Sequence, residues 1–170
     1  MRYEANFCPQ CATPLVDREV FGRVRRVCPA CGVILFRDPK VAVGGLVLHQ
    51  DHALLVRRAV HPEKGKWALP AGYMEYDEEP IPALKREIRE ETGLQVRVLR
   101  LLDVFPLHNP FARGVIIVYQ AEPEPPVPDT LQGEDDIDLA RWFLPSEVPW
   151  DMLAFESTRI ILRRWTEGAL

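Results

Sequence analysis

Hydrophobic residues along this chain are grouped in short runs that predict strands, and in two segments they recur with helical spacing. The runs with strand character are residues 41–48, 53–58, 95–104, 114–121 and 137–144. Polar or proline-rich segments separate them, as is typical of turns and loops. Residues 155–165 have apolar positions at helical spacing, which indicates a helix that packs one face against a core. With 170 residues, the chain is long enough for one globular domain and a small additional module.

The segment 80–92 is the other predicted helix, and its two adjoining edges differ in character. Pro80 and Pro82 are tolerated in a first helical turn, and Gly93 stands where a left-handed cap is favoured. At about 100° per residue, an apolar stripe lies beside an acidic edge. The stripe holds Ile81, Leu84 and Ile88, and the acidic edge holds Glu87, Glu90 and Glu91.

The three glutamates of this helix repel one another unless a partner offsets their charge. Like charges at these spacings cost about 0.2–0.5 kcal/mol per pair, and the cost rises when water is excluded. Mg²⁺ would remove this cost, because it is a hard cation that prefers carboxylate oxygens. The alternative is a solvated acidic face paired with the nearby basic residues Lys85, Arg86 and Arg89.

The loop before the helix favours the metal site. Turn residues 69–72 follow an apolar segment, and a tight turn can expose backbone carbonyls as further ligands. In the segment 72–94, five residues separate Gly72 from Glu78, and seven more separate Glu78 from REIREETGL at 86–94. This segment resembles the Nudix box. This resemblance implies a loop–helix–loop that binds Mg²⁺ or Mn²⁺ and hydrolyses a nucleoside diphosphate linked to another group.

The resemblance also implies roles for individual residues. The implied metal ligands are the carboxylates of Glu87, Glu90 and Glu91 and the backbone carbonyl of Ala71. Glu78 and Arg86 would form a buried pair that orients the helix. A carboxylate must accept the proton of the attacking water, and in this family it lies within the box or in a later loop. The later candidates are Glu134, Asp135 and Asp136, which would otherwise form a solvated acidic turn.

Four cysteines near the start of the chain form two Cys-x-x-Cys pairs separated by 16 residues. The residues are Cys8, Cys11, Cys28 and Cys31, and this spacing is typical of a zinc ribbon. Four thiolates close a tetrahedral Zn²⁺ site and leave no open position, so we expect a structural role. Two disulfides or a redox motif are the alternatives; no export signal supports the first, and neither pair heads a helix as the second requires.

The whole chain resembles the zinc-ribbon branch of the family, which includes NADH pyrophosphatases and enzymes that act on FAD and ADP-ribose. The implied fold is α/β, a Nudix α/β/α sandwich with a mixed sheet, preceded by a small zinc-ribbon module. We therefore expect a zinc ribbon over residues 1–38 and a Nudix hydrolase domain over residues 39–170. Family members are often homodimers, and the resemblance implies the same here.

The expected reaction is Mg²⁺-dependent hydrolysis of the diphosphate bond in ADP-ribose or FAD, with release of AMP. Residues 105–110 read FPLHNP, where NADH-type enzymes carry SQPWPF, and residues 146–155 resemble the tail of the FAD and ADP-ribose type. The alternatives are an NADH pyrophosphatase, a nucleoside triphosphate sanitiser and a non-catalytic nucleotide-binding regulator.

The sequence identifies the residues that contact the substrate less clearly than it identifies the metal ligands. Arg57 and Arg58 end a predicted strand and could reach a phosphate, although surface charges would look the same. Phe111 and Trp142 could stack on a base. We expect the loops at 105–113 and 133–136 to select the substrate.

Composition and charge indicate which kinds of partner this protein can bind. The net charge of −4 argues against general nucleic-acid binding through electrostatics. The sequence contains no apolar run long enough to span a membrane and no apolar N-terminal leader, so we expect a cytoplasmic enzyme that acts on a small molecule.

Overall fold

The computed structural model describes residues 5–108, 113–128, 131 and 136–170. The chain divides into two compact units, Met1–Asp38 and Pro39–Leu170, which we call the N-terminal and C-terminal units. No helix within the described ranges is long and apolar enough to cross a membrane.

The N-terminal unit is a small three-stranded antiparallel sheet with two cysteine-bearing turns. Its strands are β1 (Val16–Val20), β2 (Arg23–Val27) and β3 (Ile34–Leu35), in that spatial order. Only a few buried side chains support it, chiefly Cys8, Leu15 and Cys28. An apolar core this small stabilises a fold weakly, so a metal held by the cysteines would contribute directly to its stability.

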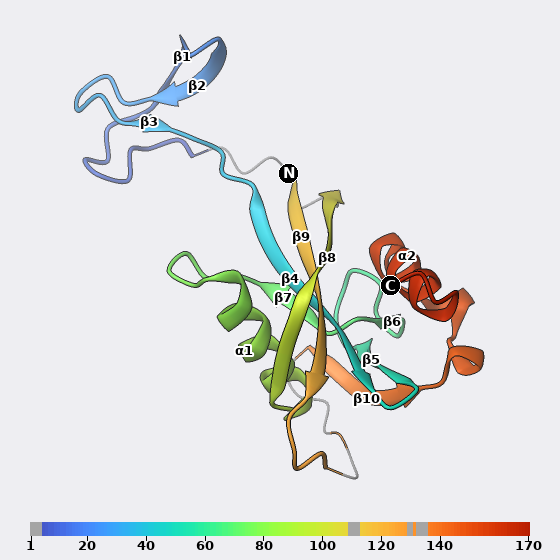
Figure 1. The fold of residues 1–170 in the computed structure, drawn as a ribbon. Helices are drawn as coiled ribbons and strands as arrows, with labels where there is room; N and C mark the ends of the chain where they lie inside the picture. Colours follow the sequence, from blue (N-terminus) through green and yellow to red (C-terminus); the bar gives the residue numbers. More distant parts are fainter. Residues whose placement is uncertain (1–4, 109–112, 129–130, 132–135) are drawn as a thin grey trace. The chain divides into compact units, whose positions relative to one another are not determined.

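The C-terminal unit is built on a mixed sheet (Figure 1). Its strands are β4 (Lys40–His49), β5 (His52–Arg58), β6 (Trp67–Ala68), β7 (Ala71–Tyr73), β8 (Val96–His108), β9 (Arg113–Pro123) and β10 (Ile137–Phe143). The main order is β10-β5-β4-β9-β8, β6 pairs with β5, and β7 pairs with β4. The β4–β9 pair is parallel and the other pairs are antiparallel.

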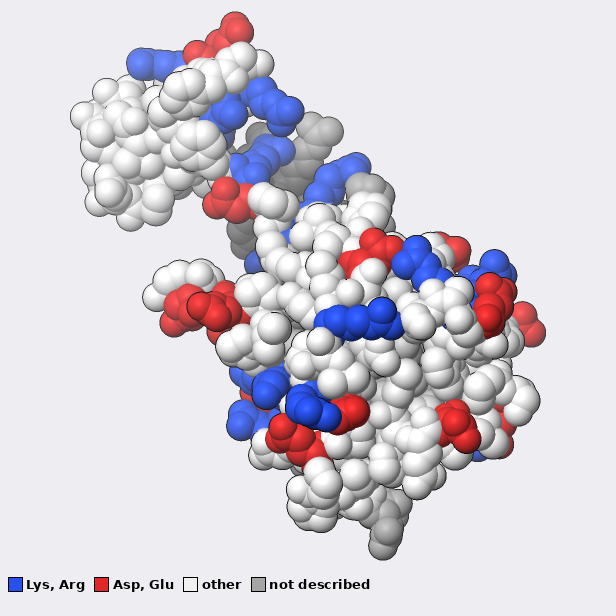
Figure 2. Space-filling view, viewed as in Figure 1, with Lys and Arg blue, Asp and Glu red and all other residues white. Residues whose placement is uncertain are grey.

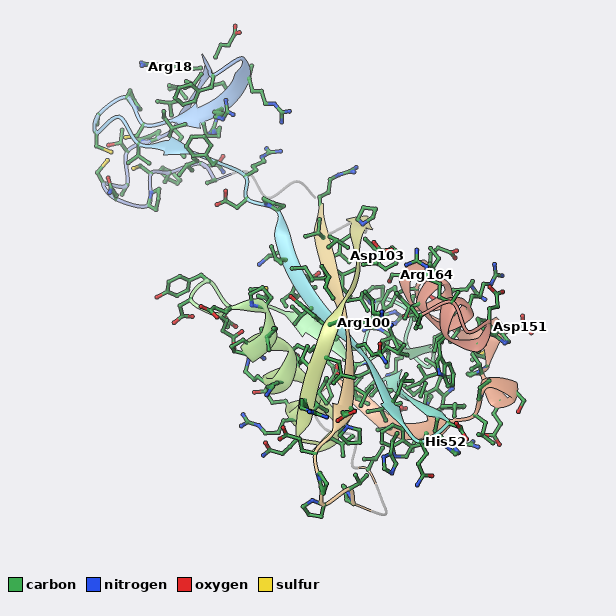
Figure 3. All side chains as sticks on the ribbon, in the orientation of Figure 1. Arg18, His52, Arg100, Asp103, Asp151 and Arg164 are labelled. Atoms are coloured by element: carbon green, nitrogen blue, oxygen red, sulfur yellow. The ribbon has the colours of Figure 1, made fainter. Side chains whose placement is uncertain are left out.

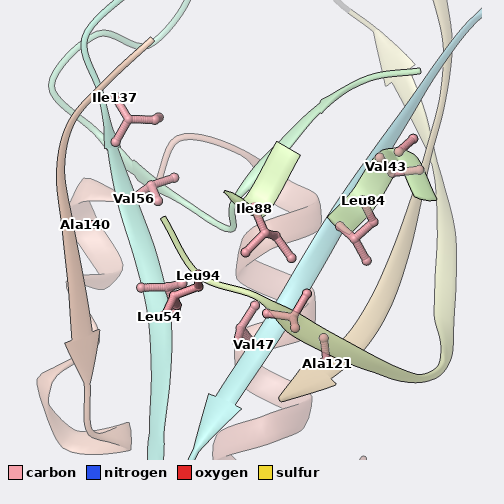
Figure 4. Packing of buried hydrophobic residues seen from close by; sticks show 12 residues of the cluster. Val43, Val47, Leu54, Val56, Leu84, Ile88, Leu94, Ala121, Ile137 and Ala140 are labelled. Atoms are coloured by element: carbon pink, nitrogen blue, oxygen red, sulfur yellow. The ribbon is translucent and has the colours of Figure 1, made fainter. Parts of the chain in front are cut away.

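Two helices cover opposite faces of this sheet, α1 (Pro80–Thr92) and α2 (Glu156–Thr166) (Figure 1). Because side chains alternate along a strand, the buried residues of β4 and β5 divide between two cores. Val43 and Leu54 pack with Leu84 of α1 (Figure 4). Leu46 and Leu55 pack in the other cluster, which holds the buried face of α2. The expected α/β/α sandwich with a mixed sheet is confirmed.

The helix α1 begins and ends as its sequence predicts. Pro80 occupies its first turn, and Gly93 caps its end with φ 74°, donating its N–H to the carbonyl of Arg89 at 2.8 Å. The predicted apolar stripe is wrong at one position, because Ile81 is 44% exposed. Ala83 is buried in its place, beside Leu84 and Ile88. Ile81 lies in the first turn, outside the part of the helix that packs on the sheet.

The strand β8 extends four residues beyond the predicted strand end at Val104. Phe105, Pro106 and Leu107 continue the pairing with β9, where a loop was expected. Pro106 is tolerated because β8 lies at the edge of the sheet, where its missing N–H removes no internal hydrogen bond. Asp103, on the same strand, holds Arg164 of α2 in an ion pair of 2.8 Å (Figure 3). The chain between β10 and α2 forms two short 3-10 turns, Pro145–Glu147 and Trp150–Met152.

Candidate functional site

The acidic edge of α1 lies against the short strand β7. The Oε2 atom of Glu91 accepts a hydrogen bond from the N–H of Ala71 at 3.1 Å. The carboxylate of Glu87 lies over Gly72, so close that a Cβ atom on residue 72 would overlap it. The start of β7 therefore holds two of the three predicted ligand carboxylates, although a turn was expected at Ala71 and Gly72, and the second position requires a residue without a side chain.

Arg86 is the centre of a charged network beside this strand. Its Nε and Nη2 atoms each donate to one carboxylate oxygen of Glu78 at 2.7 Å, in a bidentate pair. Its Nη1 atom donates to Glu87 at 2.7 Å and to Glu90 at 2.9 Å. Nη2 also donates to the carbonyl of Tyr73 at 3.1 Å, which ties the helix to the loop that precedes it. The expected Arg86–Glu78 pair is present, although both side chains are only partly buried.

The pKa values of these carboxylates are shifted in opposite directions. The Arg86 guanidinium lowers the pKa of Glu78 to about 2, and the N–H of Glu75 contributes to the shift. Burial raises the pKa of Glu91 to about 8, and the neighbouring Glu87 carboxylate adds to the rise. Burial also raises the pKa of Glu87, against the opposing effect of Arg86. Glu91 is 7% exposed, and none of the described lysines and arginines forms an ion pair with it.

The carboxylates of the three predicted ligands point in two different directions. Glu87 and Glu90 turn toward Arg86, whereas Glu91 turns toward Ala71. Among the described residues, the four cysteines are the one group of potential ligands whose atoms all lie within 4.8 Å of one another. Sequence spacing placed the glutamates on one edge, and the pairing of two of them with Arg86 corresponds in part to the alternative of an acidic face paired with basic neighbours.

A cleft of about 770 Å³ opens beside Glu91 in the C-terminal unit. Ala71, Gly72 and Tyr73 of β7 line it, together with Arg58 and Asp136. Asp136 is positioned by its backbone carbonyl, which accepts a hydrogen bond from the N–H of Ala59 at 2.7 Å. Its carboxylate is near enough to Glu91 to contribute to the raised pKa of that group. The cleft thus brings together residues from β5, β7, α1 and the start of β10.

Arg57 and Arg58, which the sequence could not distinguish, have different environments. Arg58 lines the cleft, and its Nε atom donates to the carbonyl of Pro62 at 2.7 Å. Arg57 instead forms an ion pair with Asp138 at 2.9 Å and lies over the ring of Trp67. Successive residues of a strand point to opposite faces, so only one of the two can enter the cleft. Arg57 is not among the residues that line the cleft, and its assignment to substrate binding stays a prediction.

The remaining candidate residues for substrate binding and catalysis lie either outside the described residues or away from the cleft. Phe111, Glu134 and Asp135 lie outside the described residues. Trp142 packs against His49, with ring centroids 5.7 Å apart, and is not part of the cleft lining. Trp67 packs against Phe143, with one ring edge-on to the other.

The structure adds a cleft wall that the sequence did not predict. It comes from the start of α2 and the residues just before it, including Phe155, Ser157 and Thr158. The helical spacing of 155–165 predicted a packing face, which Ile161 and Leu162 provide. The available signal was an aromatic residue at the very start of the predicted helix, where a small polar cap is usual.

The four cysteines gather in the N-terminal unit as a thiol cluster. Cys8 and Cys31 have sulfurs 3.5 Å apart, as do Cys11 and Cys28. All four thiols are free, so the disulfide alternative is not realised. Sulfurs at the corners of a tetrahedral Zn²⁺ site would lie roughly 3.8 Å apart, given Zn–S distances near 2.3 Å. The cluster therefore fits a tetrahedral metal.

Charged side chains of both signs are interspersed over the C-terminal unit (Figure 2). The visible face carries Lys and Arg beside Asp and Glu, in keeping with a chain of net charge −4.

Comparison with known proteins shows which protein family this chain resembles. The NUDIX domain model matches residues 38–164. An ADP-ribose pyrophosphatase of Methanocaldococcus jannaschii is 36% identical over 142 residues, covering 79% of each chain. An NAD-capped RNA hydrolase, NudC, of Deinococcus radiodurans is 29% identical over 92% of this chain and 55% of its own length.

A solved structure is similar to this chain over nearly its whole length. The crystal structure of a NUDIX hydrolase from Nitrosomonas europaea superposes with a TM-score of 0.87 and 31% identity. The match covers 96% of this chain and 92% of that one. The box at Gly72–Leu94, the α/β/α sandwich and these likenesses agree, and the chain is an enzyme that belongs to the Nudix hydrolase family.

Proposed function

We propose that this enzyme hydrolyses the diphosphate bond of a nucleoside diphosphate derivative, with ADP-ribose or FAD as substrate and AMP as one product. The observation that carries the proposal is the position of Glu91, a buried carboxylate at the wall of a 770 Å³ cleft that also holds Arg58 and Asp136. Arg58 provides positive charge for a diphosphate, and the volume is in the range of small-molecule sites.

The acidic residues fit a divalent cation by the chemistry of their donors. Glu91 is buried, lacks an ion pair among the described residues, and has a pKa that burial raises to about 8. A hard cation would stabilise its ionised form in the way that Arg86 stabilises Glu78. We assign Glu87, Glu90, Glu91 and the carbonyl of Ala71 to Mg²⁺ or Mn²⁺, which these groups would hold together. When bound, the cation would offset charge on the diphosphate and lower the pKa of a water molecule.

The residues of the chain supply the remaining steps. Arg58 binds and orients the diphosphate through its terminal nitrogens, which make no hydrogen bond to a described residue. Asp136, at the cleft wall near Glu91, accepts the proton of the attacking water. Glu134 remains a second candidate for this role. Glu78 and Arg86 position the helix and take no part in bond breaking.

The substrate assignment draws on both the residues and the relatives. The relative from Methanocaldococcus jannaschii is named as an ADP-ribose pyrophosphatase, which supports ADP-ribose. The NudC relative acts, by its name, on NAD-capped RNA, which keeps an NADH-type substrate as the second candidate. We further propose that residues 1–38 form a structural Zn²⁺ module and residues 39–170 the catalytic domain. The homodimer stays a prediction from the family resemblance, and the cytoplasmic location stays a prediction from the pattern of apolar residues in the sequence.

One substrate panel tests the proposal directly. The full chain is incubated with Mg²⁺ and ADP-ribose, FAD, NADH or 8-oxo-dGTP, and the products are identified. AMP from ADP-ribose or FAD, abolished by EDTA and restored by Mg²⁺ or Mn²⁺, is the expected result. Turnover of the triphosphate alone would refute the proposal. Tight nucleotide binding without turnover would favour a regulator instead.

A further inference from the structure

The cleft has an apolar lining that the diphosphate chemistry does not use. Phe105, Leu107 and Ile116 contribute to it from β8 and β9, and Phe155 and Ile160 contribute from the α2 side. Charged phosphates do not need such a surface, whereas the flat face of an aromatic base is stabilised by it. The apolar residues therefore indicate where a base, rather than a phosphate or sugar, would lie.

Phe155 is unusual for its position in the chain. It is the N-cap residue of α2, where Ser, Thr, Asp or Asn would bond a free backbone N–H, and it makes no side-chain cap hydrogen bond. Its side chain is also 36% exposed, although the buried face of α2 is formed by Ile161 and Leu162. Departures from local preference of this kind are expected at functional sites. Neither capping nor core packing explains a phenylalanine here.

Arg58 links Phe155 to the acidic part of the cleft. Its guanidinium carbon lies 5.2 Å from the centroid of the Phe155 ring, within the range of a cation–π contact. Its Nε atom is fixed by the carbonyl of Pro62 at 2.7 Å, so the guanidinium is held in place before any ligand binds. Arg58 and Glu91 also line the same cleft. One side chain thus borders both the aromatic ring and the catalytic carboxylate.

We propose that Phe155 is a specificity-determining residue that stacks on the base of the nucleotide, and that Arg58 joins this base platform to the diphosphate. The inference rests on the proposed function, because it places the base of the same substrate. The diphosphate binds the terminal nitrogens of Arg58 beside Glu91, and the base extends from it onto Phe155. The enzyme selects nucleotides over simple sugar diphosphates through this contact.

A purely structural role for Phe155 makes a different prediction. If the ring only shields Arg58 from water, leucine would serve nearly as well, because it provides similar apolar cover. If the ring stacks on a base, leucine fails, because it has no π face, and tyrosine succeeds. The variants Phe155→Leu and Phe155→Tyr therefore separate the two roles. Met152→Ala is the matched control, since Met152 is exposed, lies three residues away and does not line the cleft.

The test compares ligands that carry a base with ligands that do not. Stacking on an aromatic side chain is worth about tenfold or more in affinity. We expect Phe155→Leu to raise KM for ADP-ribose about tenfold with little change in kcat, and to weaken AMP inhibition by a similar factor. Inhibition by ribose 5-phosphate should be unchanged in every variant. Phe155→Tyr and Met152→Ala should behave as the wild type, and thermal melting should show that all variants are folded.

Two outcomes would overturn the inference. One is an unchanged KM for ADP-ribose and an unchanged AMP inhibition constant in Phe155→Leu. The other is an equal loss for AMP and ribose 5-phosphate, which would show that the ring supports the site without touching a base. Calorimetry of AMP binding to the wild type and to Phe155→Leu tests the inference even if the wild type turns over none of the proposed substrates. Failure of the proposed function is thereby distinguished from failure of the base platform.

Discussion

The carboxylate of Glu87 lies directly over Gly72, with no room for a Cβ atom between the helix α1 and the strand β7. Position 72 of the box therefore requires a glycine because the helix α1 and the strand β7 approach each other closely there. Its backbone is extended and needs no left-handed conformation, unlike that of Gly93 at the end of the same helix, which has φ 74°. This contact determines where the carboxylate of residue 87 can lie.

Gly72→Ala should displace the Glu87 carboxylate and lower kcat/KM about 100-fold while leaving the protein folded. The reason is that the new methyl group occupies the position of a proposed metal ligand. Steady-state kinetics with ADP-ribose and a melting curve measure the two effects. The double variant Gly72→Ala/Glu87→Ala is the control: it should be no slower than Glu87→Ala alone, because the side chain that clashes is gone. Additive losses in the double variant would contradict this explanation.

Glu78 gives a pH-dependent contribution to stability. Its pKa is about 2 in the folded protein, because of Arg86, and about 4.3 in an unfolded chain. Because the folded pKa is the lower one, the stabilisation is fully present above about pH 4.3 and is lost as the pH falls toward 2. Thermal melts of the wild type and of Glu78→Gln should differ by a constant amount from pH 5 to 7 and converge below pH 4. A difference that grows on acidification would contradict the assigned pair.

Asp136→Asn should lower kcat with little change in KM, because it removes the proposed proton acceptor without changing the size of the side chain. General-base groups contribute about 10²–10⁴ to the rate, so a loss in this range is expected. Asp138→Asn is the matched control, since Asp138 pairs with Arg57 and does not line the cleft. If Asp136→Asn retains most of the rate, the base must be sought elsewhere, with Glu134 as the next variant.

Cys28→Ser should release the metal of the N-terminal unit and loosen that unit. Its sulfur is buried within the four-thiol cluster, and the small apolar core of the unit offers little compensating stability. Elemental analysis should find one zinc per wild-type chain and less than one in the variant. Limited proteolysis should cleave residues 1–38 more readily, while kcat for the C-terminal unit stays near the wild-type value. Absence of zinc from the wild type would refute the zinc assignment.

Several elements of the site could be predicted because their signals are local. Gly93 ends α1 where a left-handed cap was expected, and the two Cys-x-x-Cys pairs form one thiol cluster. Residues 41–48 and 53–58 became the central strands β4 and β5. These features depend on backbone preferences and short spacings, which can be recognised in the sequence without knowing how the elements pack.

Other elements could not be predicted because they depend on distant parts of the chain. Ile81 is exposed since the sheet packs against the later turns of α1. Pro106 continues a strand because β8 happens to be an edge strand, which the order of strands along the chain does not reveal. Phe155 looked like part of a packing helix, and only the fold brings it to Arg58, 97 positions earlier in the chain.

By itself, the sequence determined the family, the reaction class, the zinc-ribbon spacing and the helix that carries the glutamates, because each resides in a contiguous or evenly spaced pattern. The tertiary structure decided which groups can act together. It directed Arg58 into the cleft and Arg57 to Asp138, brought Asp136 near Glu91, and set Phe155 at the wall. The physical reason is that burial, strand facing and charge neighbours depend on how separate elements pack, and the order of residues along one element does not contain that information.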